Sequence, residues 1–461
     1  MLLLALLSIA WAVEPTPVSC PDGTTPRGRL PPDDTERYCV AADGAPSGPY
    51  RAWYPAGAHR VEAAFAAGLR DGGYREWHAN GQVRVQGRYA AGRKVGTWSA
   101  WAESGTPTEV SGWKDGVRQG RLETWWPDGK PRLSTTYKKG VQVGTSVEFH
   151  ASGLKKDEAT WTLGVRNGPS SAWDETGRVR QQGGWIMGTR DGAWIEVDDQ
   201  GRLSEGAYVM GRKTGTWTEW SDAGQRERGG YVDNQRHGAW AIATADGKAV
   251  ASGPYTFGKR DGLWTELFPD GKKHREGAYA EDREDGLWTT WRPNGTKETE
   301  VTWARGKMSG AWIAYAPTGA KVIAGQVRDG EMFGVWERFH ANGQVAERGT
   351  WTGGVPGFGV LEKRGARVGK WETFHENGKP AVVGQVDAEG RMVGRWTFWD
   401  EAGAELRTED WREGKKVVPP PKPDAAAGAT AAAPVGKAPP VGKAPPKGAK
   451  APAKGSAPAK K

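Results

Sequence analysis

The chain has 461 residues, of which 68 are glycine and 26 are tryptophan. This composition excludes a large aliphatic core, so most buried area must come from tryptophan, which covers about 200 Å² per side chain. The net charge of +9 equals that of the tail from Lys415 to Lys461, which has ten Lys and one Asp, and residues 1–414 keep 54 basic and 54 acidic residues. A neutral body argues against a specific nucleic-acid partner, because such a partner requires a basic footprint.

The chain begins with the apolar run MLLLALLSIAWA. Its last three residues, Ala10-Trp11-Ala12, fit the small-x-small rule for signal peptidase with cleavage before Val13. The run is too short to span a membrane as a helix. We interpret residues 1–12 as a signal peptide, with a buried strand as the alternative. This interpretation predicts an exported protein of the periplasm or cell envelope, or a secreted one.

Cys20 and Cys39 are the only cysteines in the sequence. In an exported protein, an isolated pair within a charged, Pro/Gly-rich segment is typical of one disulfide, which is worth about 3 kcal/mol in the chain-entropy model. Two cysteines without a nearby histidine make a poor metal site. We expect residues 13–47 to form a disulfide-stapled cap on the open edge of the first repeat.

Glycine then recurs with a period of about 24 residues. A second glycine stands nine residues after each of the fifteen glycines that open the units. The opening glycines are Gly48, Gly72, Gly96, Gly120, Gly144, Gly168, Gly192, Gly215, Gly238, Gly262, Gly286, Gly310, Gly334, Gly369 and Gly394. Self-similarity at this period predicts stacked supersecondary units from residue 48 to residue 414.

One unit illustrates the expected conformation. Gly73 to His78 is short and aromatic, Asn80-Gly81 follows it, and Gln82 to Tyr89 alternates apolar and polar residues. This pattern predicts a β-hairpin with a two-residue Asn-Gly turn, and Gly92 to Gly96 is expected to close the second turn. The fold class is therefore all-β, with about fifteen hairpins stacked into an elongated, twisted, solenoid-like antiparallel sheet.

Most units carry a tyrosine or tryptophan two residues after the opening glycine, at position +2. A two-residue turn would place this ring opposite position +15, which is glycine in seven units. The predicted pairs are Tyr74/Gly87, Trp217/Gly230, Trp240/Gly253, Trp264/Gly277, Trp312/Gly325, Trp336/Gly349 and Trp371/Gly384. A ring over a cross-strand glycine covers its bare backbone. We therefore interpret the tryptophans as structural, with a ligand-binding aromatic ladder as the alternative.

The repeats resemble a known family. Asn234 to Trp240, NQRHGAW, and Gly258 to Trp264, GKRDGLW, are similar to the core of MORN repeats. The longer pattern G-x-W-x-x-aromatic, x-N-G, G-x-Y-x-x-G-x-K/R-x-G resembles the variant of YwqK-like antitoxin-family proteins. The resemblance implies consecutive antiparallel hairpins in a curved sheet, and roles as scaffolds, dimerisation modules or lipid-contacting surfaces. For the variant it implies binding of a protein toxin, and it supplies no catalytic residues.

One step in the repeat is irregular. Gly334 and Gly369 are 35 residues apart, so a unit is shortened within residues 353–368. One missing strand would move the later Asn-Gly turns to the opposite edge of the sheet. We therefore predict a kink or break between Gly353 and Gly365, with the Asn377-Gly378 turn on the other edge from Asn342-Gly343.

The tail, residues 415–461, is rich in Lys, Ala and Pro and has no aromatic residue. This composition is typical of a disordered, solvated segment. We interpret it as a bland solvated tail, and the alternative is that its charge engages anionic envelope polymers, lipid head groups or nucleic acid.

The repeat explains most titratable residues. His78, His150, His340 and His375 share position +6, and Asp71, Asp191, Asp261 and Asp285 directly precede opening glycines. Recurrence at one position indicates strand-end and turn roles more than acid/base catalysis. No phosphate-binding loop, nucleophile motif or metal-ligand cluster occurs in the sequence. We expect neither an enzyme nor a cofactor.

Basic residues recur two positions before the opening glycine. They are Arg70, Lys94, Arg118, Arg166, Arg190, Lys213, Arg236, Arg260 and Arg367. Stacked hairpins would align them along one edge of the sheet as a possible binding edge for an acidic partner, or as a solvated loop face. The sequence favours an exported scaffold that binds a protein or an envelope polymer, and the alternative is an antitoxin or immunity protein that neutralises one toxin.

Overall fold

The computed structural model describes residues 18–31, 33–357 and 366–418. The predicted signal peptide and the tail from residue 419 onwards lie outside these residues. Among the described residues, no helix is long and apolar enough to cross a membrane.

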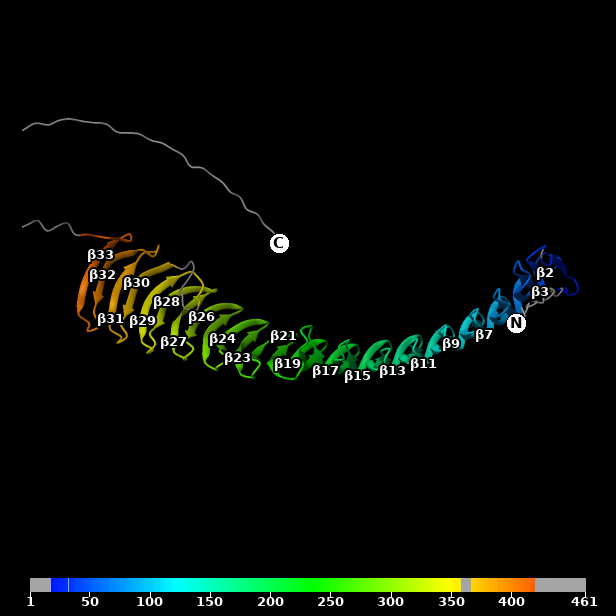
Figure 1. Ribbon diagram of the computed structural model, residues 1–461, viewed down its shortest axis with the longest axis horizontal. Coiled ribbons are helices and arrows are strands. Elements are labelled where there is room, and N and C mark those ends of the chain that lie inside the picture. Colours follow the sequence, from blue (N-terminus) through cyan, green and yellow to red (C-terminus); the bar gives the residue numbers. More distant parts are fainter. Residues whose placement is uncertain (1–17, 32, 358–365, 419–461) are drawn as a thin grey trace, which may run out of the picture.

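The described residues form one all-β antiparallel sheet of 34 strands, in which consecutive strands pair except that β21 (Lys259–Arg260) and β22 (Gly262–Leu267) both pair with β20 (Ala249–Thr256). Figure 1 shows a single layer drawn out into a long, shallow arc, with β2 and β3 at one end and β33 at the other. This arrangement confirms the predicted fold class of an elongated sheet of tandem hairpins.

The strands are β1 (Thr25–Gly28), β2 (Glu36–Val40), β3 (Pro46–Trp53), β4 (His59–Ala66), β5 (Leu69–Trp77), β6 (Val83–Ala90), β7 (Arg93–Trp101), β8 (Pro107–Lys114), β9 (Val117–Trp125), β10 (Pro131–Lys138), β11 (Val141–Phe149), β12 (Lys155–Thr162), β13 (Val165–Trp173), β14 (Val179–Ile186), β15 (Thr189–Val197), β16 (Leu203–Val209), β17 (Arg212–Trp220), β18 (Arg226–Val232), β19 (Gln235–Ala243), β20 (Ala249–Thr256), β21 (Lys259–Arg260), β22 (Gly262–Leu267), β23 (Lys273–Ala280), β24 (Arg283–Trp291), β25 (Lys297–Ala304), β26 (Lys307–Tyr315), β27 (Lys321–Arg328), β28 (Glu331–Phe339), β29 (Val345–Thr352), β30 (Ala366–Phe374), β31 (Pro380–Val386), β32 (Met392–Trp399), β33 (Glu405–Arg412) and β34 (Lys415–Lys416).

The Asn-Gly turn is longer than predicted. Between β5 and β6 it spans residues 78–82, where the His78 N–H donates to the Gln82 carbonyl at 2.8 Å and the Gly81 N–H donates to the His78 carbonyl at 2.9 Å. Gly81 has a φ of 84°, whereas Asn80 is not left-handed. This is a type I turn closed by a left-handed glycine, and we call the edge formed by such five-residue turns the long-turn edge.

The second turn is shorter than predicted. It consists of Ala91-Gly92 alone, with φ values of 46° and 77°, and β7 begins directly afterwards at Arg93. Two consecutive positive φ values define a type I′ turn, whose twist matches that of the flanking strands. We call the edge formed by these two-residue turns, from Ala67-Gly68 onwards, the short-turn edge.

The prediction for the irregular step was wrong. β29 pairs directly with β30, so no strand is missing between them. Asn342 Nδ2 donates to the Glu376 carbonyl at 2.7 Å, which places the Asn342 and Asn377 turns side by side on the long-turn edge. The extra residues lie in the connection after Thr352, where a two-residue turn would otherwise stand. Part of the predicted kink, residues 358–365, lies outside the described residues.

A β-bulge beside the long turn accounts for the difference between 24-residue and 23-residue units. In the unit from Gly72 the register shifts between Glu76 and Trp77, whereas β15–β16 and β17–β18, in the two 23-residue units, pair without this shift. Trp217 consequently pairs with Gly229, and the predicted partner Gly230 was wrong by one residue. The other six predicted backbone pairs are confirmed.

The N-terminal end continues the sheet. β1 pairs with β2 and β2 with β3, so the segment before the first repeat adds two strands. A disulfide joins Cys20 to Cys39, with the Cα atoms 5.6 Å apart. Cys39 is 1% exposed. The disulfide thus ties the chain before β1 to the second strand of the sheet.

Candidate functional site

The two faces of the sheet differ sharply. Successive residues of a strand point to opposite faces, and Trp264 is 3% exposed while Leu263 beside it is 60% exposed. The same contrast separates Trp288 from Leu287 and Trp336 from Val335. We call the face with the +2 side chains the aromatic face, and the face with the +1 side chains the open face.

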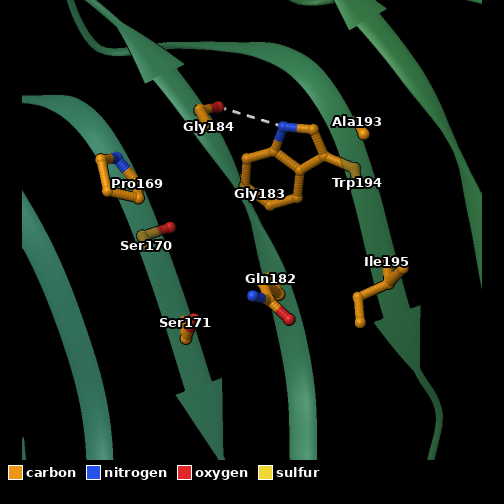
Figure 2. A pocket seen from close by; sticks show the side chains of 9 residues that line it. All are labelled: Pro169, Ser170, Ser171, Gln182, Gly183, Gly184, Ala193, Trp194 and Ile195. Carbon is orange, nitrogen blue, oxygen red and sulfur yellow. Dashed lines mark hydrogen bonds between the residues drawn. The ribbon is translucent and has the colours of Figure 1, made fainter.

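On the aromatic face nine of the ten +2 tryptophans are each seated on a glycine of the preceding strand, whereas Trp312 lies opposite Val301. A Cβ added to Gly183 would overlap the indole of Trp194, and the Trp194 Nε1–H donates to the Gly184 carbonyl at 3.0 Å (Figure 2). The expected covering ring was the one within the same hairpin, so that expectation was wrong. The ring comes from the next unit, because the cross-strand neighbour over the short turn is the +2 residue of the following hairpin.

The rings form a continuous series that we call the aromatic ladder. Tryptophans at +2 alternate with aromatic residues near position +17, and successive rings meet edge to face. The series runs Trp185, Trp194, Tyr208, Trp217, Tyr231, Trp240, Tyr255, Trp264, Tyr279 and Trp288, with centroid separations of 4.9–6.4 Å. Each such pair adds about 0.5–1.5 kcal/mol to the burial of its rings.

The nine predicted basic residues lie on this same face. Each is the second residue of its strand, and its charge is 3.9–6.0 Å from the centroids of two rings. Lys213 Nζ, for example, lies 4.3 Å from Trp217 and 5.0 Å from Tyr231. They therefore align, as predicted, but over the rings and not along an outer edge.

Carboxylates neutralise most of these cations. Ion pairs join seven of the nine to acidic residues: Arg118–Glu109, Arg166–Asp157, Arg190–Glu196, Lys213–Glu219, Arg236–Glu227, Arg260–Asp282 and Arg367–Glu347. A cation that is stacked on two rings and paired with a carboxylate has little capacity left for an acidic partner. Most cations of the aromatic face are thus satisfied internally, whereas the buried indole N–H groups of Trp336, Trp351 and Trp396 have no hydrogen-bond partner among the described residues.

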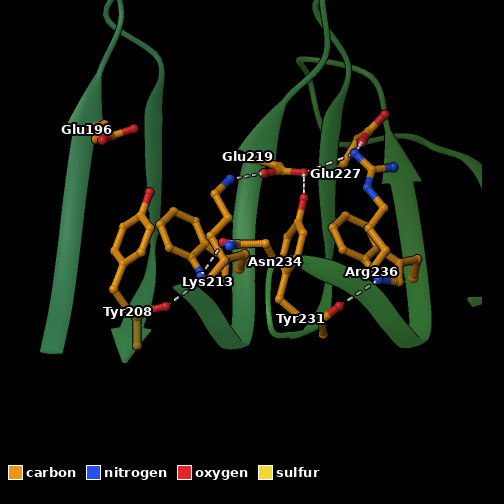
Figure 3. A network of polar contacts seen from close by, with 12 residues as sticks. Glu196, Tyr208, Lys213, Glu219, Glu227, Tyr231, Asn234 and Arg236 are labelled. Carbon is orange, nitrogen blue, oxygen red and sulfur yellow. Dashed lines mark hydrogen bonds and ion pairs between the residues drawn. The ribbon is translucent and has the colours of Figure 1, made fainter. Parts of the chain in front are cut away.

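The densest part of this network surrounds Glu219 (Figure 3). Its carboxylate accepts hydrogen bonds from Lys213 Nζ and the Tyr231 hydroxyl, both at 2.7 Å, and from Arg236 at 2.9 Å. Burial alone would raise the pKa of Glu219, but these donors and the two cations hold it below its ordinary value. Burial and the hydrogen bond to Glu219 raise the pKa of Tyr231 to about 12.

Histidines and asparagines join neighbouring long turns. His78 Nε2 lies 2.8 Å from the Trp101 carbonyl of the next hairpin, and Asn80 Nδ2 donates to the Glu103 carbonyl at 2.7 Å. His150, His340 and His375 make the same contact to the following unit. This geometry confirms the strand-end role that their common position indicated.

Three of the four acidic residues before the opening glycines, Asp71, Asp191 and Asp285, contact the short turns through their carboxylates. Asp191 Oδ1 accepts the Met210 N–H at 3.2 Å, and Asp285 Oδ1 accepts the Arg305 N–H at 3.2 Å. Asp71 makes a longer contact of the same kind, 3.5 Å to the Ala91 N–H. Each carboxylate thus satisfies the first left-handed residue of the next short turn.

The open face carries an exposed apolar row that the sequence analysis did not single out. Leu263, Leu287, Ala311 and Val335 occupy position +1 in four consecutive units, and the three larger side chains are 60, 56 and 52% exposed. We call these four residues the apolar row. A depression of about 390 Å³ beside Val335 is lined by Ala311, Ile313 and Ala324 among others. Alternation with the adjacent tryptophans was the signal that could have identified the row.

A second depression lies further towards the N-terminus. It measures about 380 Å³, and Pro169, Ser171, Gln182 and Ala193 line it from three adjacent strands (Figure 2). Its lining contains no ionisable group. Among the described residues, no group of three or more His, Cys, Asp or Glu is arranged to hold a metal ion. The chemistry available here is shape and apolar contact.

A match to one family model agrees with the repeat architecture. Residues 334–352 and 367–387 match the family described as MORN repeat variant. No curated protein matches the chain. A solved structure titled "Crystal Structure of TcdB2-TccC3-Cdc42" aligns over 82% of this chain and 23% of its own length, with 10% identity and a TM-score of 0.12. The chain thus spans about a quarter of that protein and carries MORN repeats of the variant type.

Proposed function

We propose that the chain is an exported, non-enzymatic repeat scaffold that binds a protein partner on its open face. The apolar row carries this proposal, because large apolar side chains that stay exposed and recur along one face mark a candidate interaction site. Thr302 and Gln326 of the intervening strands stand between its members, so the surface is mixed apolar and polar. Three side chains of the row are more than half exposed, and each stands beside a buried tryptophan of the opposite face. The fold itself does not need them, since Thr97, Thr145 and Ala193 hold the same position in other units.

The aromatic face supports the proposal by elimination. Its rings are stacked on one another, and its cations are stacked on rings or paired with carboxylates. A partner that engaged this face would have to break contacts that the sheet already makes. Repeat sheets present extended surfaces to partners, so the other face is the favoured one.

Export is part of the same proposal. It is supported by the apolar run of residues 1–12 and by the Cys20–Cys39 disulfide, since such bonds persist in oxidising compartments. The Lys-rich tail would add a contact to anionic envelope polymers or lipid head groups. We expect the protein in the periplasm or cell envelope, or secreted.

A crosslinking pull-down from the cell envelope tests the proposal with the full chain, with and without residues 419–461. The open-face variant carries Leu263→Lys and Leu287→Lys, and the matched control carries Thr97→Lys and Thr145→Lys at the same exposed position. Arg121 and Lys370 occupy this position naturally, so the fold accepts a cation there.

We expect the open-face variant to lose at least about tenfold in captured protein, and the control to retain it. Equal capture by both variants would refute the open-face assignment. A single dominant partner in 1:1 stoichiometry would favour the antitoxin or immunity role that the resemblance implies. Loss of capture only on removing the tail would assign binding to the tail.

A further inference from the structure

A third depression lies on the open face, near the end of the sheet that carries β2 and β3 in Figure 1. It measures about 660 Å³ and is lined from five adjacent strands, β3 to β7. Pro49, Gly73 and Thr97, the +1 residues of three successive units, line it and place it on the open face. We call it the Gly73 depression. Its other lining side chains include Arg75 and Arg88.

The fold does not require glycine at position 73. Gly73 does not have a left-handed φ, and a Cβ added there would meet no atom within 4 Å. Gly87, by contrast, is required because the Trp98 indole lies over it. The other fourteen of the fifteen units all carry a side chain at the +1 position. Neither conformation nor packing therefore explains Gly73, and its missing side chain keeps the depression open.

An ion pair of the neighbouring hairpin is replaced in this one. In the first hairpin Arg51 faces Glu62, and the Glu62 carboxylate accepts N–H groups of Arg51 at 3.2 and 3.1 Å. In the second hairpin Arg75 takes the position of Arg51, but the residue that faces it is Gln86. Glu62 also lies opposite Arg75 across the short turn, yet its carboxylate is engaged with Arg51. Within the described part of the chain, Arg75 has no carboxylate partner.

Arg88 is a second cation without a counter-ion. It lies opposite Gly73, two residues along the strand from the partner of Arg75. Arg75 stands 5.9 Å from the Trp77 ring, and neither arginine forms an ion pair within residues 18–31, 33–357 and 366–418. Both side chains are exposed. Diagonal neighbours on adjacent strands are about 7–8 Å apart, which long side chains can span. Both guanidinium groups can therefore reach one anion.

We propose that the Gly73 depression binds a phosphorylated small molecule, with Arg75 and Arg88 holding the phosphate. Two guanidinium forks offer more donors than one carboxylate accepts in a bidentate pair, whereas a phosphate supplies three acceptor oxygens. The bound anion neutralises two like charges that stand side by side. The volume lies within the range of ligand sites, about 300–1,000 Å³. It exceeds what the phosphate alone fills, so the space beside Gln86 takes a polar body of the size of a sugar.

This site goes beyond the proposed binding of a protein partner. The Gly73 depression lies N-terminal to the apolar row, and the lining of the depression beside Val335 shares no residue with it. Substitutions in one region leave the other unchanged. Failure of the phosphate site would therefore leave the protein-binding proposal standing, and the reverse also holds.

Calorimetric titration of the full chain with glucose-6-phosphate tests the site. We expect one saturable site per chain, at least about tenfold weaker in Arg75→Gln/Arg88→Gln, because charge-assisted hydrogen bonds are lost. The matched control, Arg121→Gln/Arg228→Gln, removes the same charge from the open face elsewhere and should bind as the wild type does. Glucose should not bind at these concentrations, and inorganic phosphate should bind more weakly. A wild type without saturable binding, equal weakening in both variants, or inorganic phosphate bound as tightly as the sugar phosphate would overturn the proposal.

Gly73→Leu separates the depression from the charge, because it keeps both arginines. Leu263 and Leu287 hold the same +1 position in other units, and no atom stands in the way of a Cβ here, so the fold should accept the change. We expect at least about tenfold weaker binding of glucose-6-phosphate, since the leucine fills space that the ligand needs. Ala239→Leu is the matched control at the same position. Unchanged affinity in Gly73→Leu would contradict the role of the missing side chain.

Vesicles of phosphatidylcholine and phosphatidylglycerol distinguish a soluble phosphate from a lipid head group. We expect the wild type and Arg75→Gln/Arg88→Gln to sediment equally with these vesicles. Sedimentation that depends on the two arginines, in a protein that does not bind glucose-6-phosphate, would overturn the proposal in favour of a lipid head group.

Discussion

Two stretches of the aromatic face pack the +2 side chain against the preceding strand in different ways. From Gly183 to Trp288, every +2 residue is tryptophan, and the residue opposite it on the preceding strand, at position +15 or at +14 in the 23-residue units, is glycine. From Ser111 to Ser170, the +2 residues are Leu122, Ser146 and Ser170, and they oppose Ser111, Thr135 and Ala159. No glycine is needed where no indole has to be seated.

In the second stretch the large aromatic side chains stand at a different position of the repeat. There Trp113 and Trp161 stand at position +17, as does Trp185 in the hairpin that begins with Ser170's strand, whereas the first stretch mostly has tyrosine near this position. The Trp113 indole N–H donates to Ser111 Oγ at 2.9 Å, and that of Trp185 donates to Ser170 Oγ at 2.7 Å. The +2 residue of one hairpin and the residue opposite it on the preceding hairpin therefore vary as a pair. Because a large residue on one strand faces a small one on the other, the repeat length stays the same when the side chains differ greatly in size. Val301 opposite Trp312 departs from this rule, and nothing in the structure explains it.

The largest expected effect comes from removing one ring of the ladder. Trp240 is 2% exposed and lies between Tyr231 and Tyr255, so Trp240→Ala should cost about 3–5 kcal/mol locally. Ser146→Ala, at the same position in the other stretch, should cost less than about 1 kcal/mol. Hydrogen exchange should show the loss in β17–β20 alone, because repeats contact only their neighbours. Equal losses of stability in both variants would contradict the expected difference between the two stretches.

A smaller effect is expected from alkaline pH. The pKa of Tyr231 is raised to about 12 by burial and by Glu219. A group whose pKa is higher in the folded state keeps its proton longer there, so its stabilisation is full below pH 10 and declines between pH 10 and 12, by at most about 2–3 kcal/mol.

Tyrosinate absorbance and urea unfolding at a series of pH values measure this effect. Tyr231→Phe should remove part of the decline, while Tyr74 and Tyr315, whose pKa values are also raised to about 12, should supply much of what remains. Ionisation of all tyrosines near pH 10 in the folded protein would contradict the buried Tyr231–Glu219 contact.

Much of the fold could be predicted because the glycines that form its turns recur at a regular spacing. Position +9 glycine marks every long turn, and the pairing of Trp240 with Gly253 follows from counting. Two features escaped that reasoning. A 35-residue step cannot distinguish a lost strand from a long connection, since both change the spacing equally. The register across the short turn, which seats Trp98 on Gly87, required that turn to be two residues long.

The candidate site was harder to predict for a related reason. In sequence, Leu263-Trp264 looks like one apolar segment, and only the strand conformation sends the two side chains to opposite faces. The basic residues were found correctly as a series, but their stacking over Trp and Tyr depends on neighbouring hairpins. Sequence spacing alone therefore made them resemble a free surface.

A double-mutant cycle on Gly277 and Trp288 tests whether the residues at these two positions vary as a pair. Gly277→Ser and Trp288→Leu, made singly and together, transplant the Ser111–Leu122 pair into the first stretch. Urea unfolding of the four proteins gives the coupling free energy. We expect the double variant to be more stable than the sum of the single losses implies, by about 1–3 kcal/mol, because the serine no longer meets an indole. Strictly additive losses would show that the glycine and the tryptophan are chosen independently, which contradicts the account.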